Sequence, residues 1–360
     1  MKISVTSHHY YPHTGGTERV VKTSVDALSE MGHEVHVFSD IEDLQVLKDS
    51  EKIQYHGIKL RKIGKFRFPP SDYWKMLRKA GSDIYHIHGQ RVWSSDYLYM
   101  NLNKIKAKKL FTAHGFYQLI YGGTLNSVYY RKLMPSFLSK FDHIISLTEK
   151  EKNITTDLAP DLAEKISVIP DPVDFHRISV SGDIGVTVSK YGLDAGKYFI
   201  HSGGLQKNKN IEFIIRAIKG LEQPLVLTGN TPDQSYAAYL KQLASENKVN
   251  LIFAGNVPDE DLYTLMAGSD AFLFSSKFES FGVAMVEAVY SGARVISADT
   301  GVARDLSADR MLQIVDSPAQ MRESITNYRR RIDLDSIRKK LESNYATGTI
   351  MGRLEKLYEN

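Results

Sequence analysis

Residues 270–292 read DAFLFSSKFESFGVAMVEAVYSG. The first five residues predict a buried β-strand, and the run after Gly282 predicts a helix that ends at the Ser-Gly step of 291–292. Glu279 then lies in the loop between strand and helix. Glu287 lies in the helix, on a face that looks back toward the loop. A strand, a loop and a helix in this order are typical of an α/β fold.

The same stretch carries two carboxylates eight residues apart, with an aromatic-glycine step between them. Carboxylates accept hydrogen bonds from sugar and ribose hydroxyls, a glycine permits close backbone approach, and a helix N-terminus favours phosphates. The pattern therefore fits a receptor for a sugar attached to a diphosphate. Taken alone it fits equally a solvated loop residue, Glu279, and an exposed helix residue, Glu287, so the rest of the chain has to decide.

Short β-rich runs alternate with amphipathic helical runs along most of the chain, which predicts parallel sheets covered by helices on both faces. Strands are predicted at 2–6, 34–38, 84–88, 109–113, 143–147 and 166–169, and then at 198–201, 225–228, 250–254, 271–274 and 294–297. Helices in the second half are predicted at 211–221, 236–247 and 259–267. We therefore predict two doubly wound units, at 1–172 and 173–333. We expect a final helical segment, 334–360, to cross back to the first unit.

Composition sets limits on the class of protein. The chain has 360 residues, 42% of them hydrophobic and 24% charged, with no cysteine and a net charge of +4. These values predict a globular protein without disulfides or thiolate chemistry. The N-terminus enters a strand directly and lacks the pattern of a signal peptide, so we expect a cytoplasmic enzyme.

A basic segment spans residues 59–140, where sixteen Lys and Arg residues face three acidic ones and aromatic residues are interleaved. Such a surface could serve an anionic membrane, an anionic acceptor or nucleic acid, or it could be a solvated basic face. Residues 125–141 could form an amphipathic helix at a membrane interface. No nucleic-acid motif accompanies the basic residues, so nucleic acid is not predicted as a partner.

In the first unit, the candidate site residues follow strand ends. Gly15 and Gly16 precede a helix and would offer backbone amides to an anion. His114 ends a strand and precedes a glycine, and we predict a functional role for it. His86 fits a packed, hydrogen-bonded histidine better. A zinc site among His86, His88 and His114 is weakly supported because cysteine is absent and no third ligand has a recognised spacing. No metal site is predicted.

In the second unit, the loop at 202–210 reads SGGLQKNKN and follows the first predicted strand. Gly203 allows a close backbone approach, while Lys207 and Lys209 lie just before a helix. Their ammonium groups could neutralise a diphosphate leaving group. Lysines in a polar loop are otherwise simply solvated.

Taken together, these motifs resemble the retaining, nucleotide-sugar-dependent glycosyltransferases of family 4, which have the GT-B fold. The resemblance spans essentially the whole chain and is most specific at the pair Glu279 and Glu287. It implies that Glu287 holds the nucleotide ribose and that Glu279 contacts the donor sugar. It also implies that Lys209 and Gly16 lie near the diphosphate and that His114 lines the reaction centre. The backbone of Ser280, Phe281, Gly282 and Val283 would approach sugar and phosphates.

Two positions depart from the family pattern. The family usually has Gly-Arg-Leu before the phosphate-binding lysine, whereas this chain has glycine at 203 and 204 and leucine at 205. Stabilisation of the leaving group would then rest on Lys209, Lys207, backbone amides and a helix dipole. The segment that joins the two predicted units also differs: it has Asp171-Pro172 where the family often has Asn-Gly or Asn-Pro.

The predicted function is transfer of a sugar from a nucleotide-diphosphate sugar to an acceptor hydroxyl, with retention of anomeric configuration. The acceptor would be a glycan or a lipid-linked molecule of surface polysaccharide or glycoconjugate synthesis. No metal or cofactor is expected, and the enzyme would be cytoplasmic with peripheral contact to an anionic membrane through residues 59–140. Two alternatives stay open: a nucleotide-sugar epimerase or phosphorylase on the same fold, and a non-catalytic nucleotide-sugar-binding module.

Overall fold

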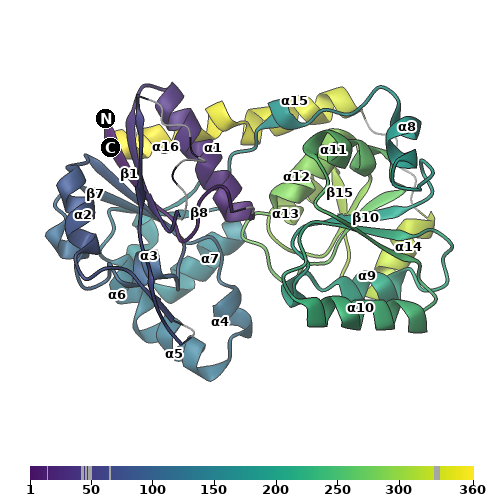
Figure 1. The fold of residues 1–360 in the computed structure, drawn as a ribbon, viewed down its shortest axis with the longest axis horizontal. Helices are drawn as coiled ribbons and strands as arrows, with labels where there is room; N and C mark the ends of the chain where they lie inside the picture. Colours follow the sequence, from purple (N-terminus) through teal and green to yellow (C-terminus); the bar gives the residue numbers. More distant parts are fainter. Residues whose placement is uncertain (14, 42–43, 45–46, 48–50, 65, 328–332) are drawn as a thin grey trace. The chain divides into compact units, whose positions relative to one another are not determined.

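The computed structural model describes residues 1–13, 15–41, 44, 47, 51–64, 66–327 and 333–360. The chain divides into two compact units. Unit 1 comprises Met1–Pro172 and Thr347–Asn360, and unit 2 comprises Val173–Ala346 (Figure 1). Residues 328–332, in the predicted second unit, and Lys65, in the predicted basic segment, lie outside the described residues.

Unit 1 contains a seven-stranded sheet in the order β3-β2-β1-β6-β7-β8-β9, in which every neighbouring pair is parallel. Its strands are β1 (Lys2–Thr6), β2 (Glu34–Ser39), β3 (Ile53–Gly57), β6 (Ile84–His88), β7 (Lys108–Thr112), β8 (His143–Ser146) and β9 (Ile166–Val168). A separate antiparallel hairpin consists of β4 (Arg61–Ile63) and β5 (Phe66–Phe68).

Most helices of unit 1 lie between strands of the sheet, as crossovers between parallel strands require, and α16 follows at the C-terminal end of the chain. They are α1 (Gly16–Glu30), α2 (Tyr73–Ala80), α3 (Trp93–Asp96), α4 (Tyr117–Tyr121), α5 (Gly123–Lys132), α6 (Met134–Leu138), α7 (Glu149–Leu158) and α16 (Thr347–Glu359), with 3-10 turns η2 (Leu102–Lys104) and η3 (Pro160–Lys165). Val21, Val25 and Leu28 recur along one face of α1 and are buried in the core.

The C-terminal helix α16 completes the core of unit 1. Its residues Ile350, Met351, Leu354 and Tyr358 are buried in the same hydrophobic cluster as α1 and the first strands. The hydroxyl of Tyr358 is 2.9 Å from Nδ1 of His86 on β6. The last helix is therefore part of the packing of unit 1, although it is far from the other core residues in the sequence.

Unit 2 contains a six-stranded parallel sheet in the order β12-β11-β10-β13-β14-β15. Its strands are β10 (Phe199–Ser202), β11 (Leu225–Thr228), β12 (Leu251–Gly255), β13 (Ala271–Phe274), β14 (Val295–Ser297) and β15 (Leu312–Ile314). Its helices are α8 (Ile184–Ser189), α9 (Ile211–Ala217), α10 (Gln234–Glu246), α11 (Asp259–Gly268), α12 (Val283–Ser291), α13 (Ala303–Ala308), α14 (Pro318–Asn327) and α15 (Leu334–Tyr345), with η4 (Phe175–Arg177) and η5 (Lys207–Lys209).

Helices cover both faces of the sheet of unit 2. Figure 1 shows α11 and α12 on one side of the strands and α9 and α10 on the other. The apolar residues of α9, α10 and α14 join one buried cluster with β10, β11 and β13. Because both faces are covered, Leu225–Thr228 and Ala271–Phe274 are buried along their whole length, and all their residues except Thr228 are apolar.

Two parallel α/β units of this kind confirm the predicted fold class, and most predicted strands lie within one or two residues of the observed ones. The exceptions are β3, the hairpin β4–β5 and β15, which the sequence analysis does not predict. Strands β3 and β15 are edge strands, and β4, β5 and β15 have three residues each. Their existence depends on pairing with a neighbour more than on a local pattern.

The predicted helical segment 125–141 differs from the structure, and the predicted segment 334–360 consists of two helices. Residues 125–141 do not form one helix, because α5 ends at Lys132 and α6 begins at Met134, and the apolar residues Met134, Phe137 and Leu138 pack into the core. Residues 334–360 divide at Ala346. The guanidinium of Arg338 donates to the carbonyl of Tyr290, so α15 stays with unit 2, while α16 belongs to unit 1. Within the described residues, no helix is both long enough and apolar enough to cross a lipid bilayer.

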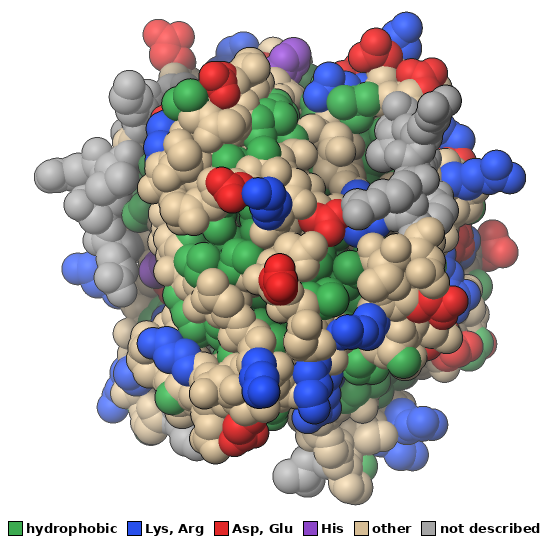
Figure 2. Space-filling view, turned by 90° about the vertical axis from the view of Figure 1, so that its right-hand side faces the viewer, with side chains coloured by type: hydrophobic (Ala, Val, Ile, Leu, Met, Phe, Trp, Pro, Cys, Tyr) green, Lys and Arg blue, Asp and Glu red, His purple; other side chains and the backbone are tan. Residues whose placement is uncertain are grey.

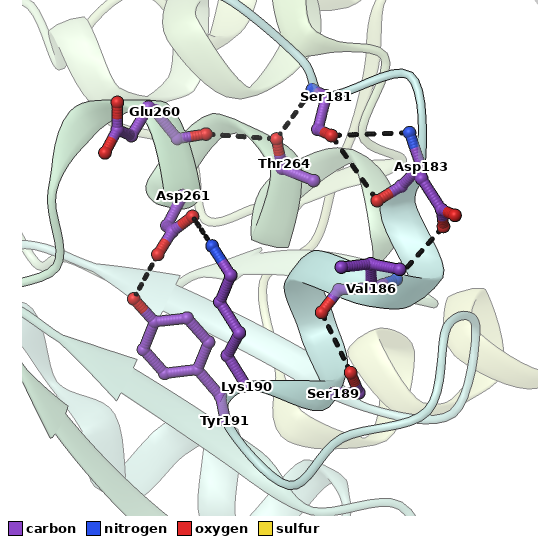
Figure 3. Close-up of polar contacts among 9 residues, drawn as sticks. All are labelled: Ser181, Asp183, Val186, Ser189, Lys190, Tyr191, Glu260, Asp261 and Thr264. Atoms are coloured by element: carbon purple, nitrogen blue, oxygen red, sulfur yellow. Dashed lines mark hydrogen bonds and ion pairs between the residues drawn. The ribbon is translucent and has the colours of Figure 1, made fainter.

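Helix α8 docks on α11 through a small network of polar contacts (Figure 3). The amide of Ser181 donates to Oγ1 of Thr264 at 2.9 Å, and Lys190 and Tyr191 both contact Asp261. The opposite face of α8 is solvent-exposed, with Val186 at 59% exposure. In Figure 2, hydrophobic surface at this end of unit 2 is interrupted by single acidic and basic side chains.

The close approach of α8 to α11 requires a glycine at position 268. A Cβ there would lie 2.6 Å from Cγ2 of Ile184 and 3.1 Å from Cγ1 of Val188. We expect Gly268→Ala to destabilise unit 2 by about 1–3 kcal/mol, because α8 must move away. Thermal and urea unfolding measure this change.

The matched control is Gly352→Ala in α16, where an added Cβ meets nothing within 4 Å. Alanine has the higher helix propensity, so this variant should be as stable as the parent or up to about 1 kcal/mol more stable. Equal destabilisation by both substitutions would contradict the packing explanation.

Candidate active site

In each unit, the strand order reverses beside the first strand. Strand β10 pairs with β11 on one side and β13 on the other, and β1 pairs likewise with β2 and β6. The connections leave these neighbouring strands in opposite directions, so the loops at their carboxyl ends separate and leave room for a ligand. In unit 2 these loops are 203–210 after β10 and 275–282 after β13, which contain most of the predicted site residues.

The two loops of unit 2 are fastened to each other. Oγ of Ser275 donates to the carbonyls of Lys209 and Asn210 at 2.8 and 2.9 Å. The amide of Lys277 donates to the carbonyl of Asn208 at 2.8 Å. These bonds fix the backbone that carries Lys209 relative to the backbone that carries Glu279.

Lys209 and Glu279 form an ion pair, with 2.7 Å between Nζ and Oε1. Their side chains are 18% and 15% exposed, so the pair is only partly screened by water. The amide of Glu279 donates to Oγ1 of Thr300 at 2.7 Å, which orients the loop. The structure thus brings together two residues that lie 70 positions apart in the sequence.

The neighbouring glycines shape this corner of unit 2. Gly203 has φ +146°, and a Cβ there would lie 3.7 Å from Cε of Lys209. At Gly204, where the family pattern has arginine, a Cβ would lie 2.8 Å from Oδ1 of Asn230. A side chain at 204 would therefore have to displace Asn230. Lys207 is exposed in η5, on the same loop as Lys209.

The start of α12 is rigid. Gly282 is its N-cap with φ +92°, and Val283 is its first residue. Phe281 is buried at 1% exposure and its carbonyl accepts a hydrogen bond from Val302. Ser280 is half-buried in the same loop. The first amides of a helix point outward and favour an anion, so the fixed backbone of 280–283 presents an anion-binding end beside Glu279.

Glu287 lies in the second turn of α12 and is 7% exposed. The hydroxyl of Tyr263 on α11 donates to its Oε1 at 3.0 Å. This contact was not predicted, because Tyr263 lies in an apolar helical run that signals only core packing. Tyr263 is fully buried and holds the Glu287 carboxylate in place. Its counterpart in the loop, Glu279, is held by Lys209 instead.

The other predicted site residues belong to unit 1. Gly15 is the N-cap of α1 and Gly16 is its first residue. A Cβ at Gly15 would overlap the carboxylate of Glu18, which lies over the helix N-terminus. An anion that binds these amides would thus have to displace Glu18, a competitor that the sequence analysis does not identify.

His114 follows β7 with φ +54°, a left-handed conformation that is uncommon for a residue other than glycine. Its Nε2 is 2.9 Å from Nδ1 of His88. Burial lowers the pKa of His114 to about 4, so its imidazole is neutral at pH 7. His86 bonds to Tyr358 and Thr112 and is a packed histidine, as expected.

A buried carboxylate supports the backbone after His114. Oε1 of Glu151 accepts from the amide of Gly115 at 2.8 Å, and its Oε2 accepts from the amide of Leu147 at 2.6 Å. Burial raises the pKa of Glu151 to about 7. Burial, and secondarily the charge of Glu151, raises the pKa of Asp171 to about 8. Because two amides donate to Glu151, we assign the shared proton of this pair to Asp171.

These carboxyls make the stability of unit 1 depend on pH. The folded-state pKa of Asp171 exceeds the unfolded value of about 4, so between these values the folded state holds a proton that the unfolded state has lost, and this stabilisation falls as pH rises to about 8. We expect urea unfolding of unit 1 to show stability falling from about pH 5 to about pH 8 and levelling off above that. Asp171→Asn should flatten this fall because the amide does not titrate.

The matched control is Asp157→Asn on α7, where the carboxylate is exposed. This variant should retain the pH dependence of the parent. A parent protein whose stability does not fall over this range, or a fall that Asp171→Asn leaves unchanged, would contradict the assignment of a buried proton to Asp171.

Comparisons with known proteins agree with this architecture. The profile of Glycosyltransferase Family 4 matches residues 14–177, and that of Glycosyl transferases group 1 matches residues 189–339. The chain is 25% identical over 319 residues to N-acetyl-alpha-D-glucosaminyl L-malate synthase of Bacillus anthracis, covering 84% of this chain and 79% of that protein. It is 24% identical over 335 residues to alpha-monoglucosyldiacylglycerol synthase of Streptococcus pneumoniae, covering 86% and 74%.

Solved structures share the fold. Sucrose-phosphate synthase from Thermosynechococcus elongatus has a TM-score of 0.79 at 17% identity, covering 99% of this chain and 98% of that one. Anabaena Alr3699/HepE in complex with UDP-glucose also has a TM-score of 0.79 at 17% identity, covering 100% and 99%. With both profiles matched in order along the two units, the chain belongs to the family 4 glycosyltransferases of the GT-B fold.

Proposed function

We propose that this glycosyltransferase moves a sugar from a nucleotide-diphosphate sugar to an acceptor hydroxyl, with retention of anomeric configuration. The observation that carries the proposal is the Lys209–Glu279 pair at the carboxyl ends of β10 and β13, where α/β sheets bind ligands. The ammonium group suits a diphosphate and the carboxylate suits sugar hydroxyls. In the absence of a substrate, each neutralises the other.

Unit 2 would bind the donor. Lys209 exchanges Glu279 for a phosphate oxygen, which frees the carboxylate to accept hydrogen bonds from the sugar. The N-terminus of α12 faces the remaining negative charge of the diphosphate, and the Glu287 carboxylate accepts hydrogen bonds from the ribose hydroxyls. Lys207 and the backbone of Gly203 add to the phosphate side of the site. These groups supply positive charge, so we do not expect the reaction to need a metal or a cofactor.

Retention follows from the roles given to the carboxylates. With Lys209 on the phosphate, the Glu279 carboxylate accepts hydrogen bonds from the sugar, so it orients the donor and does not attack it. In the proposed step, the bond from the anomeric carbon to the phosphate oxygen breaks and the bond to the acceptor oxygen forms on the same face. The acceptor proton passes to the leaving phosphate. Neutral His114 would hydrogen-bond a substrate hydroxyl.

The relatives suggest the class of acceptor. One similar protein is named for the synthesis of a glucosyl diacylglycerol, and another is the GPI3 subunit of a yeast phosphatidylinositol N-acetylglucosaminyltransferase. We therefore propose a glycan or lipid-linked acceptor in surface polysaccharide or glycoconjugate synthesis, met by a cytoplasmic enzyme at an anionic membrane. The structure of HepE with UDP-glucose supports a nucleotide-sugar donor.

Substitution of the charged pair tests the proposed chemistry. We expect Lys209→Ala and Glu279→Gln each to lower turnover by about 100-fold or more, because each removes a group that stabilises the transition state. Their melting temperatures should change little, since both side chains lie in loops. Nucleotide release with a panel of donors and acceptors measures turnover, and donor-induced thermal stabilisation identifies the donor.

Lys219→Ala and Glu222→Gln, at exposed positions elsewhere in unit 2, are the matched controls and should keep parental activity. Equal losses of activity and stability would refute the assigned roles. Donor binding without nucleotide release for any acceptor would favour the binding module, and donor turnover without acceptor would favour an epimerase or phosphorylase.

Membrane contact is tested separately through α4 and α5. Ile120, Tyr121, Val128 and Leu133 are each about half exposed there, next to the basic residues Arg131 and Lys132. We expect the protein to float with anionic vesicles at low salt and to dissociate as salt rises. Charge reversal of Arg131 and Lys132 to Glu should abolish flotation, whereas reversal of the exposed Lys219 in unit 2 should not. No association with anionic vesicles at low salt would contradict the contact.

A further inference from the structure

A second cluster of chemically active side chains lies in unit 1, apart from the residues assigned above. His9 and His13 come from the loop between β1 and α1, and Asp40 directly follows β2. One ligand atom from each of these residues lies within 4.8 Å of the others. Two imidazoles and a carboxylate at such separations match the donor set of a divalent transition-metal ion.

The cluster is built on anchored backbone. Tyr10, between the two histidines, is fully buried in the core of unit 1, and its carbonyl accepts from the amide of His13 at 3.0 Å. The carbonyl of His8 accepts from Nε1 of Trp93 at 3.1 Å. Asp40 is 7% exposed, so its carboxylate is held in the protein while His13 remains exposed to solvent. An ion could therefore enter from the His13 side.

The contact between His9 and Asp40 shows what an ion would replace. Nδ1 of His9 is 2.7 Å from Oδ2 and 2.9 Å from Oδ1 of Asp40, a separation that a shared proton bridges. A metal ion binds imidazole nitrogen and carboxylate oxygen at about 2.0–2.2 Å, and it binds only the deprotonated ligands. Slight separation of the two side chains, with the imidazole N–H of His9 on Nε2, would admit the ion.

Two neighbouring side chains, His8 and Arg67, would affect the affinity of this cluster for a metal ion. The ring centroid of His8 is 3.9 Å from that of His9, and its buried Nδ1 has no hydrogen-bond partner within the described part of the chain. This nitrogen could support an ion directly or through water. Arg67 acts in the opposite sense, because its Nη1 is 3.4 Å from Oδ2 of Asp40 and its positive charge competes with a cation. The Arg67 side chain is 47% exposed and can withdraw into solvent.

We propose that His9, His13 and Asp40 form a binding site for one divalent transition-metal ion, with Zn²⁺ as the favoured occupant. Three protein ligands leave a coordination position open to water or to an oxygen of a bound molecule. The site lies at the carboxyl ends of β1 and β2 in unit 1 and shares no residue with the Lys209–Glu279 pair of unit 2. It is independent of the proposed transfer reaction, which needs no metal.

The test uses the 360-residue chain after dialysis against a chelator. Zn²⁺ is titrated by calorimetry in buffers of different ionisation enthalpy, and Co²⁺ is titrated by its visible absorption. We expect one ion per chain. His13→Ala and Asp40→Asn should each weaken binding at least about tenfold, by loss of a ligand. Arg67→Ala should strengthen binding several-fold, which a purely structural role of the cluster would not produce.

His176→Ala is the matched control, because His176 is an exposed histidine of unit 2 outside the cluster. It should bind Zn²⁺ as tightly as the parent. The proposal is overturned if the parent binds no Zn²⁺ or Co²⁺, or if His13→Ala binds as tightly as the parent. It is equally overturned if His176→Ala loses as much affinity as His13→Ala. Because His13 is exposed, its replacement should leave the fold intact, which the melting temperature verifies.

Discussion

Parallel pairing of the first strand with two neighbours is the constraint on which both units depend. Strand β10 between β11 and β13, and β1 between β2 and β6, direct consecutive connections away from each other at the carboxyl edge of each sheet. The backbone hydrogen bonds of the sheet therefore decide where loops can separate and where polar side chains can gather. In unit 2 they bring Nζ of Lys209 to 2.7 Å from Oε1 of Glu279, and in unit 1 they bring Nδ1 of His9 beside the carboxylate of Asp40.

Electrostatics then distinguishes the two units. In unit 2, the partly exposed charges of Lys209 and Glu279 are paired with each other and can be exchanged for charges on a ligand at moderate desolvation cost. Unit 1 instead buries groups that burial keeps neutral, such as His114, and a protonated carboxyl at Asp171. A neutral imidazole on a strained backbone, supported by Glu151, is suited to hydrogen bonding and not to charge neutralisation. This division is consistent with the proposal that unit 2 binds the charged donor.

At position 204, where the family usually has arginine, this chain has glycine, and the space beside this glycine is occupied. Asn230 occupies the space that a side chain at 204 would enter, and its backbone carbonyl also accepts from the amide of Leu205. The absence of an arginine side chain at 204 and the position of Asn230 are therefore sterically linked. In the proposed donor site, the positive charge comes from the lysines of the same loop, of which Lys209 is paired with Glu279 and Lys207 is exposed.

The sequence by itself determined the fold class, the place of most strands and the loop positions of Glu279 and Lys209, because apolar periodicity and glycine steps are local signals. It did not determine the short edge strands β3 and β15, which need a paired neighbour, or the break at Leu133 that turns a predicted surface helix into core packing. Only the tertiary structure decided that Tyr263 holds Glu287, that Glu18 covers the Gly15 turn and that Asp40 lies beside His9. Each of these contacts depends on the direction of a side chain. Strand pairing and helix packing set that direction, whereas sequence spacing alone leaves it open.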